Sequence, residues 1–220
     1  MTPWLAVPGL DGVQGLAVFV GAGLLLNLTP GADVALIAAR SAGQGARSGA
    51  AAALGVGAGC GLHALAAALG LSALVAGSPW AFAALRWAGA AYLLWLGWGL
   101  LRAAAAPQAA IGADLPPASF GRVFLQGFWT NALNPKVVMF FLAFVPQFVR
   151  PDAPHPALSF ALLGIVFSVN GTLVNLGFAV ALASLRQRFG GGGRWGAWLA
   201  RGTGAVLIAL GLKLALGDRV

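Results

Sequence analysis

The sequence has few charged residues for its length. Only 8% of its 220 residues are Asp, Glu, Lys or Arg, whereas soluble domains carry about 25%. Among the charged residues the acidic ones are the rarer, with five in the whole chain. Only one of the five lies deep in an apolar run. An enzyme needs a nucleophile with its base, or clustered acids or histidines. The composition therefore argues against a water-soluble fold. It also argues against an enzyme, because the acids that a catalytic site would need are so few.

Cysteine and histidine are nearly absent. The single cysteine, Cys60, excludes an intrachain disulfide and a thiol-relay pair. His63 lies three positions after it, and two such residues are too few for a metal site. The Gly190–Gly193 run is followed by no phosphate-binding pattern. We therefore expect no bound metal and no cofactor.

Basic residues outnumber acidic ones, and the net charge is +8. They stand singly at the ends of apolar runs, without the basic face or the aromatic–basic interleaving of nucleic-acid binders. We therefore exclude nucleic acid as a partner. In a membrane protein such residues are signals of topology.

Apolar residues dominate the chain, at 60%. Residues 48–85 and 153–185 contain no Asp, Glu, Lys or Arg, and each run exceeds the ~20 apolar residues that cross a bilayer as a helix. The alternating segments of a membrane β-barrel are absent. The sequence therefore predicts an all-α integral membrane protein whose partner is the lipid bilayer.

Six transmembrane helices fit the pattern of apolar runs. We predict spans at about residues 13–40, 49–75, 81–101, 120–148, 157–185 and 196–216, with an Ala/Pro-rich segment, Ala103–Ser119, between the third and fourth. The chain is thus a single transmembrane domain, residues 1–220, with repeat 1 at 13–101, a linker at 102–119 and repeat 2 at 120–216. Because each repeat has an odd number of spans, the second must be inverted relative to the first.

Orientation follows from the positive residues of short loops, which favour the cytoplasmic side. Three of the connecting regions are the richer in arginine, namely those carrying Arg40 and Arg47, Arg102 and Arg122, and Arg186, Arg188 and Arg194. The multi-pass chain is therefore predicted to have both termini outside.

The first span of each repeat is interrupted by proline. The two interruptions read Asn27-Leu-Thr-Pro-Gly-Ala-Asp33 and Asn131-Ala-Leu-Asn-Pro-Lys136. Each looks like an N-cap residue, Thr29 or Asn134, followed by proline at the first helical position. Each proline also frees a carbonyl four residues earlier, at Leu26 or Asn131. We therefore predict that the first helix of each repeat is broken.

Matching breaks in two inverted repeats point to a transport site near the midplane. The half-helices that follow the breaks aim their N-termini inward, which favours an anion such as a substrate carboxylate. Lys136 would add a positive charge, and Asp33 could bind an amine or carry a proton. Two alternatives stay open: the prolines are structural kinks, or Asp33 and Lys136 only pair with each other.

Other polar or small residues lie within the predicted spans. Asn170 and Asn175 of the fifth span either line a cavity or bond helices together. Glycines 55, 57, 59 and 61 predict close helix packing, within the chain or in a homodimer, and so leave a homodimer open. Arg40 is interpreted as an anchor at the cytoplasmic end and not as a site residue.

Several segments resemble one known family. They are Thr29-Pro-Gly-Ala-Asp33, Gly89-Ala-Ala-Tyr92-Leu-Leu-Trp-Leu-Gly97, Gly127-Phe-Trp-Thr-Asn-Ala-Leu-Asn-Pro-Lys136, Phe140-Phe141 and Pro146-Gln147-Phe148. In this order and spacing they resemble the LysE/RhtB family of amino-acid exporters. The chain departs from the family at Ala32, where a second proline is usual.

The resemblance implies a secondary active exporter of amino acids or related small zwitterionic metabolites across the bacterial inner membrane, driven by the proton-motive force. Its alternative is a metal-cation exporter of the same superfamily. Protons are the expected coupling ion, and Asp33 the proton-coupling residue. The expected substrate-binding residues are Thr29, Pro30, Gly31, Asp33, Asn131, Asn134, Pro135 and Lys136.

Overall fold

A computed structural model describes residues 9–29, 31–71, 79–103 and 116–189, together with residues 201, 205, 208, 209, 211, 212, 215 and 216. Pro30, most of the predicted linker and most of the predicted sixth span lie outside the described residues. The predictions for Pro30 and for the sixth span therefore stay predictions.

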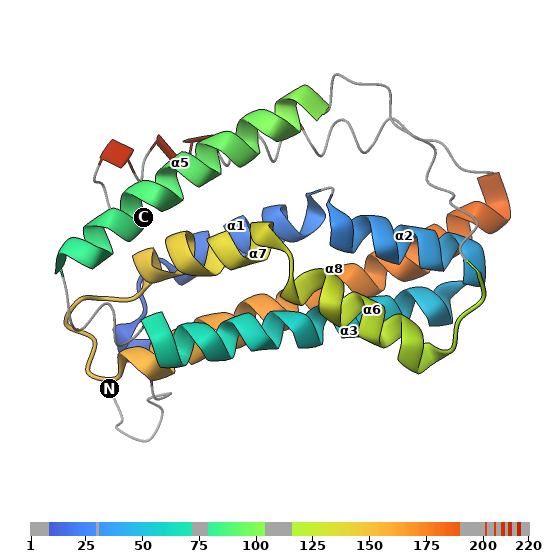
Figure 1. The fold of residues 1–220 in the computed structure, drawn as a ribbon, viewed down its shortest axis with the longest axis horizontal. Coiled ribbons are helices and arrows are strands. Elements are labelled where there is room, and N and C mark those ends of the chain that lie inside the picture. Colours follow the sequence, from blue (N-terminus) through green and yellow to red (C-terminus); the bar gives the residue numbers. More distant parts are fainter. Residues whose placement is uncertain are drawn as a thin grey trace.

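The described part of the chain is helical (Figure 1). Its only strand-like pairing is an isolated antiparallel bridge between Val13 and Val149. This agrees with the predicted all-α class. The long helices are α1 (Leu16–Leu28), α2 (Ala32–Gln44), α3 (Ala46–Ala66), α5 (Pro79–Ala103), α6 (Phe120–Ala132) and α8 (Pro156–Phe189), and α7 (Pro135–Met139) is short.

Several of these helices are suited to a bilayer. Residues Ala46–Leu71, which are α3 with a π-helical end, and Pro156–Ser184 of α8 are each long and apolar enough to cross one. Two further spans result if each bent pair counts as one: α1 with α2, bent by 55°, and α6 with Pro135–Phe148, bent by 47°. Both predicted breaks are present, since these bends fall at residues 29–31 and 133–134.

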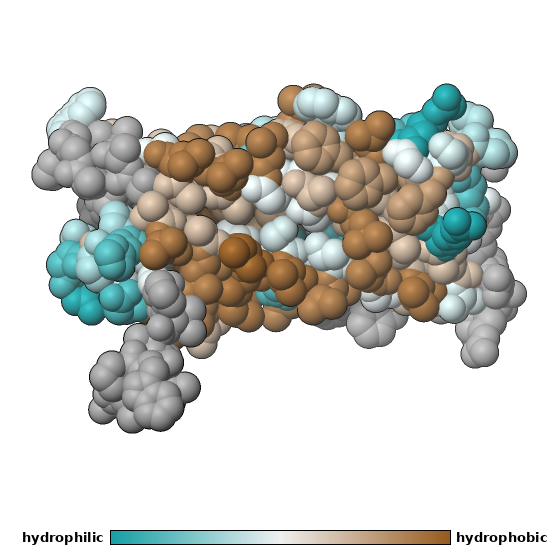
Figure 2. Space-filling view, turned by 90° about the horizontal axis from the view of Figure 1, so that it is seen from below, coloured by the Kyte–Doolittle hydropathy of each residue, from teal (hydrophilic) through white to brown (hydrophobic). Residues whose placement is uncertain are grey.

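The two broken helices run in opposite directions (Figure 1). Helices α1 and α7 lie toward one end of the molecule, α2 and α6 lie toward the other, and α3 and α8 extend alongside both. One face of the molecule shows a band of hydrophobic residues over its middle, with hydrophilic residues at its two ends (Figure 2). This distribution suits a protein whose middle contacts lipid.

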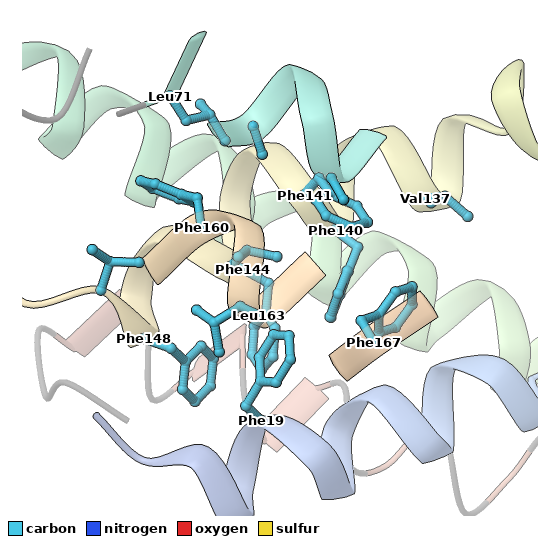
Figure 3. Close-up of a cluster of buried hydrophobic side chains, with 14 of the residues drawn as sticks. Phe19, Leu71, Val137, Phe140, Phe141, Phe144, Phe148, Phe160, Leu163 and Phe167 are labelled. Atoms are coloured by element: carbon cyan, nitrogen blue, oxygen red, sulfur yellow. The ribbon is translucent and has the colours of Figure 1, made fainter. Parts of the chain in front are cut away.

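The buried apolar residues form two clusters. The larger contains seven phenylalanines (Figure 3), namely Phe19, Phe140, Phe141, Phe144, Phe148, Phe160 and Phe167. The smaller contains Ile37, Ala51, Ala52, Ala53, Val56, Val123 and Ala179. Each broken helix contributes to both clusters. The larger cluster contains Leu26 of the first and Val137 of the second, and the smaller contains Ile37 of the first and Val123 of the second. Both breaks therefore lie where one apolar cluster gives way to the other.

Glycines allow α3 to pack closely on its neighbours. A Cβ atom added to Gly55 or Gly59 would overlap a backbone oxygen of α6, that of Phe124 or Phe128, and one added to Gly57 would overlap Thr172 of α8. The predicted close packing is thus found within the chain.

Candidate functional site

The first break does not have the predicted cap. Thr29 is the C-cap of α1, and its Oγ1 donates to the carbonyl of Leu25 at 2.7 Å. Helix α2 begins after Gly31, which has extended backbone and offers no side chain for capping. The prediction that Thr29 is an N-cap was therefore wrong. A threonine hydroxyl at the end of a helix readily bonds the carbonyl four residues earlier, and that bond assigns Thr29 to α1.

The second break has the predicted cap. Asn134 precedes α7, and its side-chain oxygen accepts the backbone N–H of Lys136 at 3.0 Å. Pro135 follows at the first helical position, where its missing N–H costs no helical bond. The cap leaves the Asn134 amide NH₂ free to act as a donor elsewhere.

That donor binds Asp33, which joins the two breaks. Asp33 lies in the first turn of α2 with 6% of its surface exposed. Its Oδ2 accepts the amide N–H groups of Asn131 at 3.0 Å and Asn134 at 2.9 Å. Its Oδ1 is buried and has no hydrogen-bond partner within the described part of the chain. A carboxylate of the chain itself therefore occupies the N-terminus of α2, where the helix dipole favours a negative charge.

Lys136 binds the opposite kind of helix end. Its ammonium Nζ lies 3.2 Å from the carbonyl oxygen of Leu26 and 3.4 Å from that of Thr29, at the C-terminal end of α1, where a cation is favoured. Gly31 makes room for it, since a Cβ atom there would lie 3.3 Å from Nζ. Asp33 and Lys136 thus bond different groups and not each other. Together with Asn131, Asn134 and the carbonyls of Leu26 and Thr29 they form what we call the polar layer.

A histidine that the sequence analysis left unassigned also contacts a break. His63 of α3 places its Nε2 3.1 Å from the backbone oxygen of Asn131. That oxygen and the one of Leu26 are the two carbonyls that the prolines were predicted to free. A signal for His63 was present, because an interrupted helix at membrane depth is tolerated where neighbouring helices bond its backbone groups.

A small polar cavity adjoins this layer. Its volume is about 10 Å³, enough for about one water molecule. The lining residues come from α1, α3, α6 and α8 and are Asn27, Val56, Gly57, Cys60, Asn131, Phe167, Ser168, Gly171, Thr172 and Asn175. Asn131 alone belongs both to this lining and to the bonds of Asp33.

Three further polar residues of the predicted spans, Asn170, Asn175 and Arg40, have different surroundings. Asn175 lines the cavity, whereas Asn170 donates to the backbone of Val20 at 3.5 Å and bonds α8 to α1. Arg40 is 3% exposed and donates to Gln126 at 2.7 Å and to the carbonyl of Pro116 at 3.0 Å. It therefore anchors α2 to neighbouring protein segments, although the sequence suggested an anchor at the membrane surface.

Comparison with protein families decides the class of the chain. The model of the LysE type translocator family matches residues 24–218, a range that includes both breaks and the polar layer between them. The chain belongs to the LysE type translocator family. The resemblance drawn from the break motifs is therefore confirmed.

Individual relatives of this LysE type translocator include named efflux proteins. A homoserine/homoserine lactone efflux protein of Salmonella typhi is 37% identical over 155 residues, 70% of this chain and 74% of the relative. A leucine efflux protein of Salmonella choleraesuis is 30% identical over 160 residues, 72% and 74% of the two chains. An uncharacterized membrane protein of Pseudomonas aeruginosa is 31% identical over 208 residues, 93% and 96%. No solved structure matches the chain.

Proposed function

We propose that this LysE type translocator is a secondary active exporter of amino acids or related small zwitterionic metabolites across the bacterial inner membrane, driven by the proton-motive force. Its family consists of translocators, and two relatives are named as efflux proteins, for homoserine or its lactone and for leucine. The observation that carries the proposal is the buried Asp33, with one carboxylate oxygen held by two asparagines and the other without a partner.

The unpartnered polar atoms of the layer match the two ends of a zwitterion. Among the described residues Asp33 Oδ1 and Asn131 Oδ1 are buried acceptors without a partner, and Asn27 Nδ2 is a buried donor without one. In the proposal an α-ammonium group bonds the two oxygens, and an α-carboxylate bonds Asn27 and is attracted by the charge of Lys136. Each such hydrogen bond to a buried group stabilises the bound substrate by about 1–3 kcal/mol.

The other residues of the two breaks would shape this site. In the proposal Thr29, Pro30 and Gly31 interrupt the first helix, and Asn134 and Pro135 interrupt the second. The interruptions expose backbone groups, which would stay bonded to the substrate while the half-helices move. Non-helical backbone at membrane depth is tolerated where it lines such a cavity.

Asp33 would also couple export to protons. A substrate ammonium and a proton compete for the same carboxylate, so the site holds one or the other. Loading with substrate inside and with a proton outside then exchanges the two across the membrane. Export against a gradient would follow from the inward proton-motive force without any other energy source.

The proposed architecture has six spans in two inverted repeats, residues 13–101 and 120–216, in one domain with both termini outside. Its support is the opposite direction of the two broken helices (Figure 1). In this arrangement the half-helices α2 and α7 approach the same layer from opposite sides of the bilayer. Alternating access would then rock one repeat against the other around Asp33.

The test is efflux from cells preloaded with a panel of amino acids and dipeptides. Wild-type protein is compared with Asp33→Asn, each with and without an uncoupler, after both proteins are quantified in the membrane. We expect uncoupler-sensitive efflux of one or a few amino acids, lost in the variant. Efflux of no panel member would contradict the proposal and favour the metal-cation alternative, to be tested with divalent cations.

A further inference from the structure

His63 contacts the proposed site through the backbone of a substrate-binding residue. The carbonyl of Asn131 lies four residues before Pro135, which has no N–H to bond it. That oxygen accepts the N–H of Asn134 at 2.9 Å and lies 3.1 Å from His63 Nε2. Because a carbonyl oxygen only accepts hydrogen bonds, Nε2 must carry the proton. The contact therefore selects the Nε2–H form of the ring.

The bond joins three elements in one chain of contacts. His63 of α3 holds the backbone of Asn131 near the end of α6, and the side chain of Asn131 donates to Asp33 of α2 at 3.0 Å. Asn131 is 3% exposed and lines the polar cavity. A shift at the end of α6 would therefore move both the bond to Asp33 and the lining of the cavity.

The surroundings of the ring hold it at this position. It stacks on Phe141 with ring centroids 5.9 Å apart and an angle of 30° between the planes. Gly59, one helical turn earlier on α3, lets α6 approach, since a Cβ atom there would lie 3.0 Å from the Cβ of Asn131. The close helix contact and the stacking together bring Nε2 to the carbonyl.

We propose that His63 is a positioning residue for transport, acting as an Nε2–H donor that holds the end of α6 so that Asn131 stays bonded to Asp33. The role of His63 in transport rests on the proposed function, whereas its bond to Asn131 does not. A donor role differs from a proton-carrying role, because any side chain with an N–H at the same place can replace it.

Three variants test the donor role in the efflux assay. His63→Gln keeps an N–H donor of similar reach, His63→Leu keeps the bulk without the donor, and His155→Gln removes the other histidine, which is exposed in a loop. Because the carbonyl of Asn131 keeps the N–H of Asn134, loss of the His63 bond should lower the maximal efflux rate by about 2- to 10-fold in His63→Leu. His63→Gln should restore most of the rate, and His155→Gln should match wild type. Full activity of His63→Leu, or equal loss in His63→Gln, would overturn the proposal.

The bond can also be measured without transport. The chain has two histidines, so ¹⁵N-histidine labelling of the His155→Gln protein in lipid leaves one imidazole to observe by solid-state NMR. We expect a proton on Nε2, with this nitrogen hydrogen-bonded to a backbone carbonyl. A ring that carries its proton on Nδ1 alone would overturn the proposal. If no amino acid is exported but the Nε2–H bond is seen, the proposed function fails and the positioning contact stands.

Discussion

The ammonium of Lys136 lies 3.2 Å from the carbonyl oxygen of Leu26, although the two residues are 110 positions apart in the chain. His63 reaches the carbonyl of Asn131 in the same way, so each broken helix receives a donor from the other half of the chain. Both carbonyls therefore receive a side-chain donor in addition to one backbone N–H each, from Thr29 at 3.2 Å and from Asn134 at 2.9 Å. Such bonds let interrupted helices exist at membrane depth, where an unpaired backbone group costs several kcal/mol.

Replacing Lys136 by methionine should destabilise the fold as well as end export. The change removes the donor to Leu26 and Thr29, and we expect a loss of about 1–3 kcal/mol. Melting temperature in detergent and efflux in cells are the measurements. Arg47→Met is the matched control, because it removes an exposed cation in the first turn of α3. Unchanged stability of the Lys136 variant would mean that another group satisfies the α1 carbonyls.

Two substitutions of Asn134 separate its cap from its bond to Asp33. Asn134→Ala removes both and should cost about 1 kcal/mol for the cap alone. Asn134→Asp keeps an oxygen for the N–H of Lys136 but turns the donor 2.9 Å from Asp33 into a second carboxylate. We expect both variants to insert and both to lose efflux. Wild-type efflux by Asn134→Asp would show that the bond to Asp33 is not needed.

Glycine substitutions should distinguish the packed faces of the bundle from the open one. A Cβ atom at Gly127 of α6 would overlap the carbonyl oxygen of Ala52, whereas one at Gly61 of α3 would meet nothing within 4 Å. Gly127→Ala should therefore lower stability by about 1–3 kcal/mol through overpacking. Gly61→Ala should be neutral or slightly stabilising, since alanine favours a helix. Equal melting temperatures of the two variants would contradict the packing of α3 on α6.

The single cysteine is a native probe of the cavity. Cys60 is 4% exposed and lines the cavity with Asn27 and Asn131, so a membrane-permeant maleimide should label it slowly. An exported amino acid should slow the labelling further, and an amino acid that is not exported should leave it unchanged. Mass spectrometry of the intact protein measures the rate, with Cys60→Ser as the unlabelled control. A labelling rate that is the same with and without an exported amino acid would mean that the substrate binds outside this cavity.

Local chemistry made much of the site predictable. Proline lacks an N–H in any setting, so Pro135 marked its break and Asn134 its cap without knowledge of the fold. The same reasoning failed at Thr29, because a threonine between two half-helices can bond either one, and its hydroxyl bonds Leu25 of the preceding helix. The choice between these two bonds depends on backbone direction at the break, which the residue types do not encode.

The sequence by itself determined the membrane class, the two breaks and the family, because composition, proline chemistry and motif spacing are properties of short segments. Only the tertiary structure decided which groups meet in the polar layer. Asp33 bonds asparagines about a hundred positions away, Lys136 bonds the end of α1, and His63 bonds Asn131. These contacts depend on how closely α3 approaches α6 and on how the two broken helices pass each other. Such distances arise from the packing of the whole bundle and leave no periodic trace along the chain.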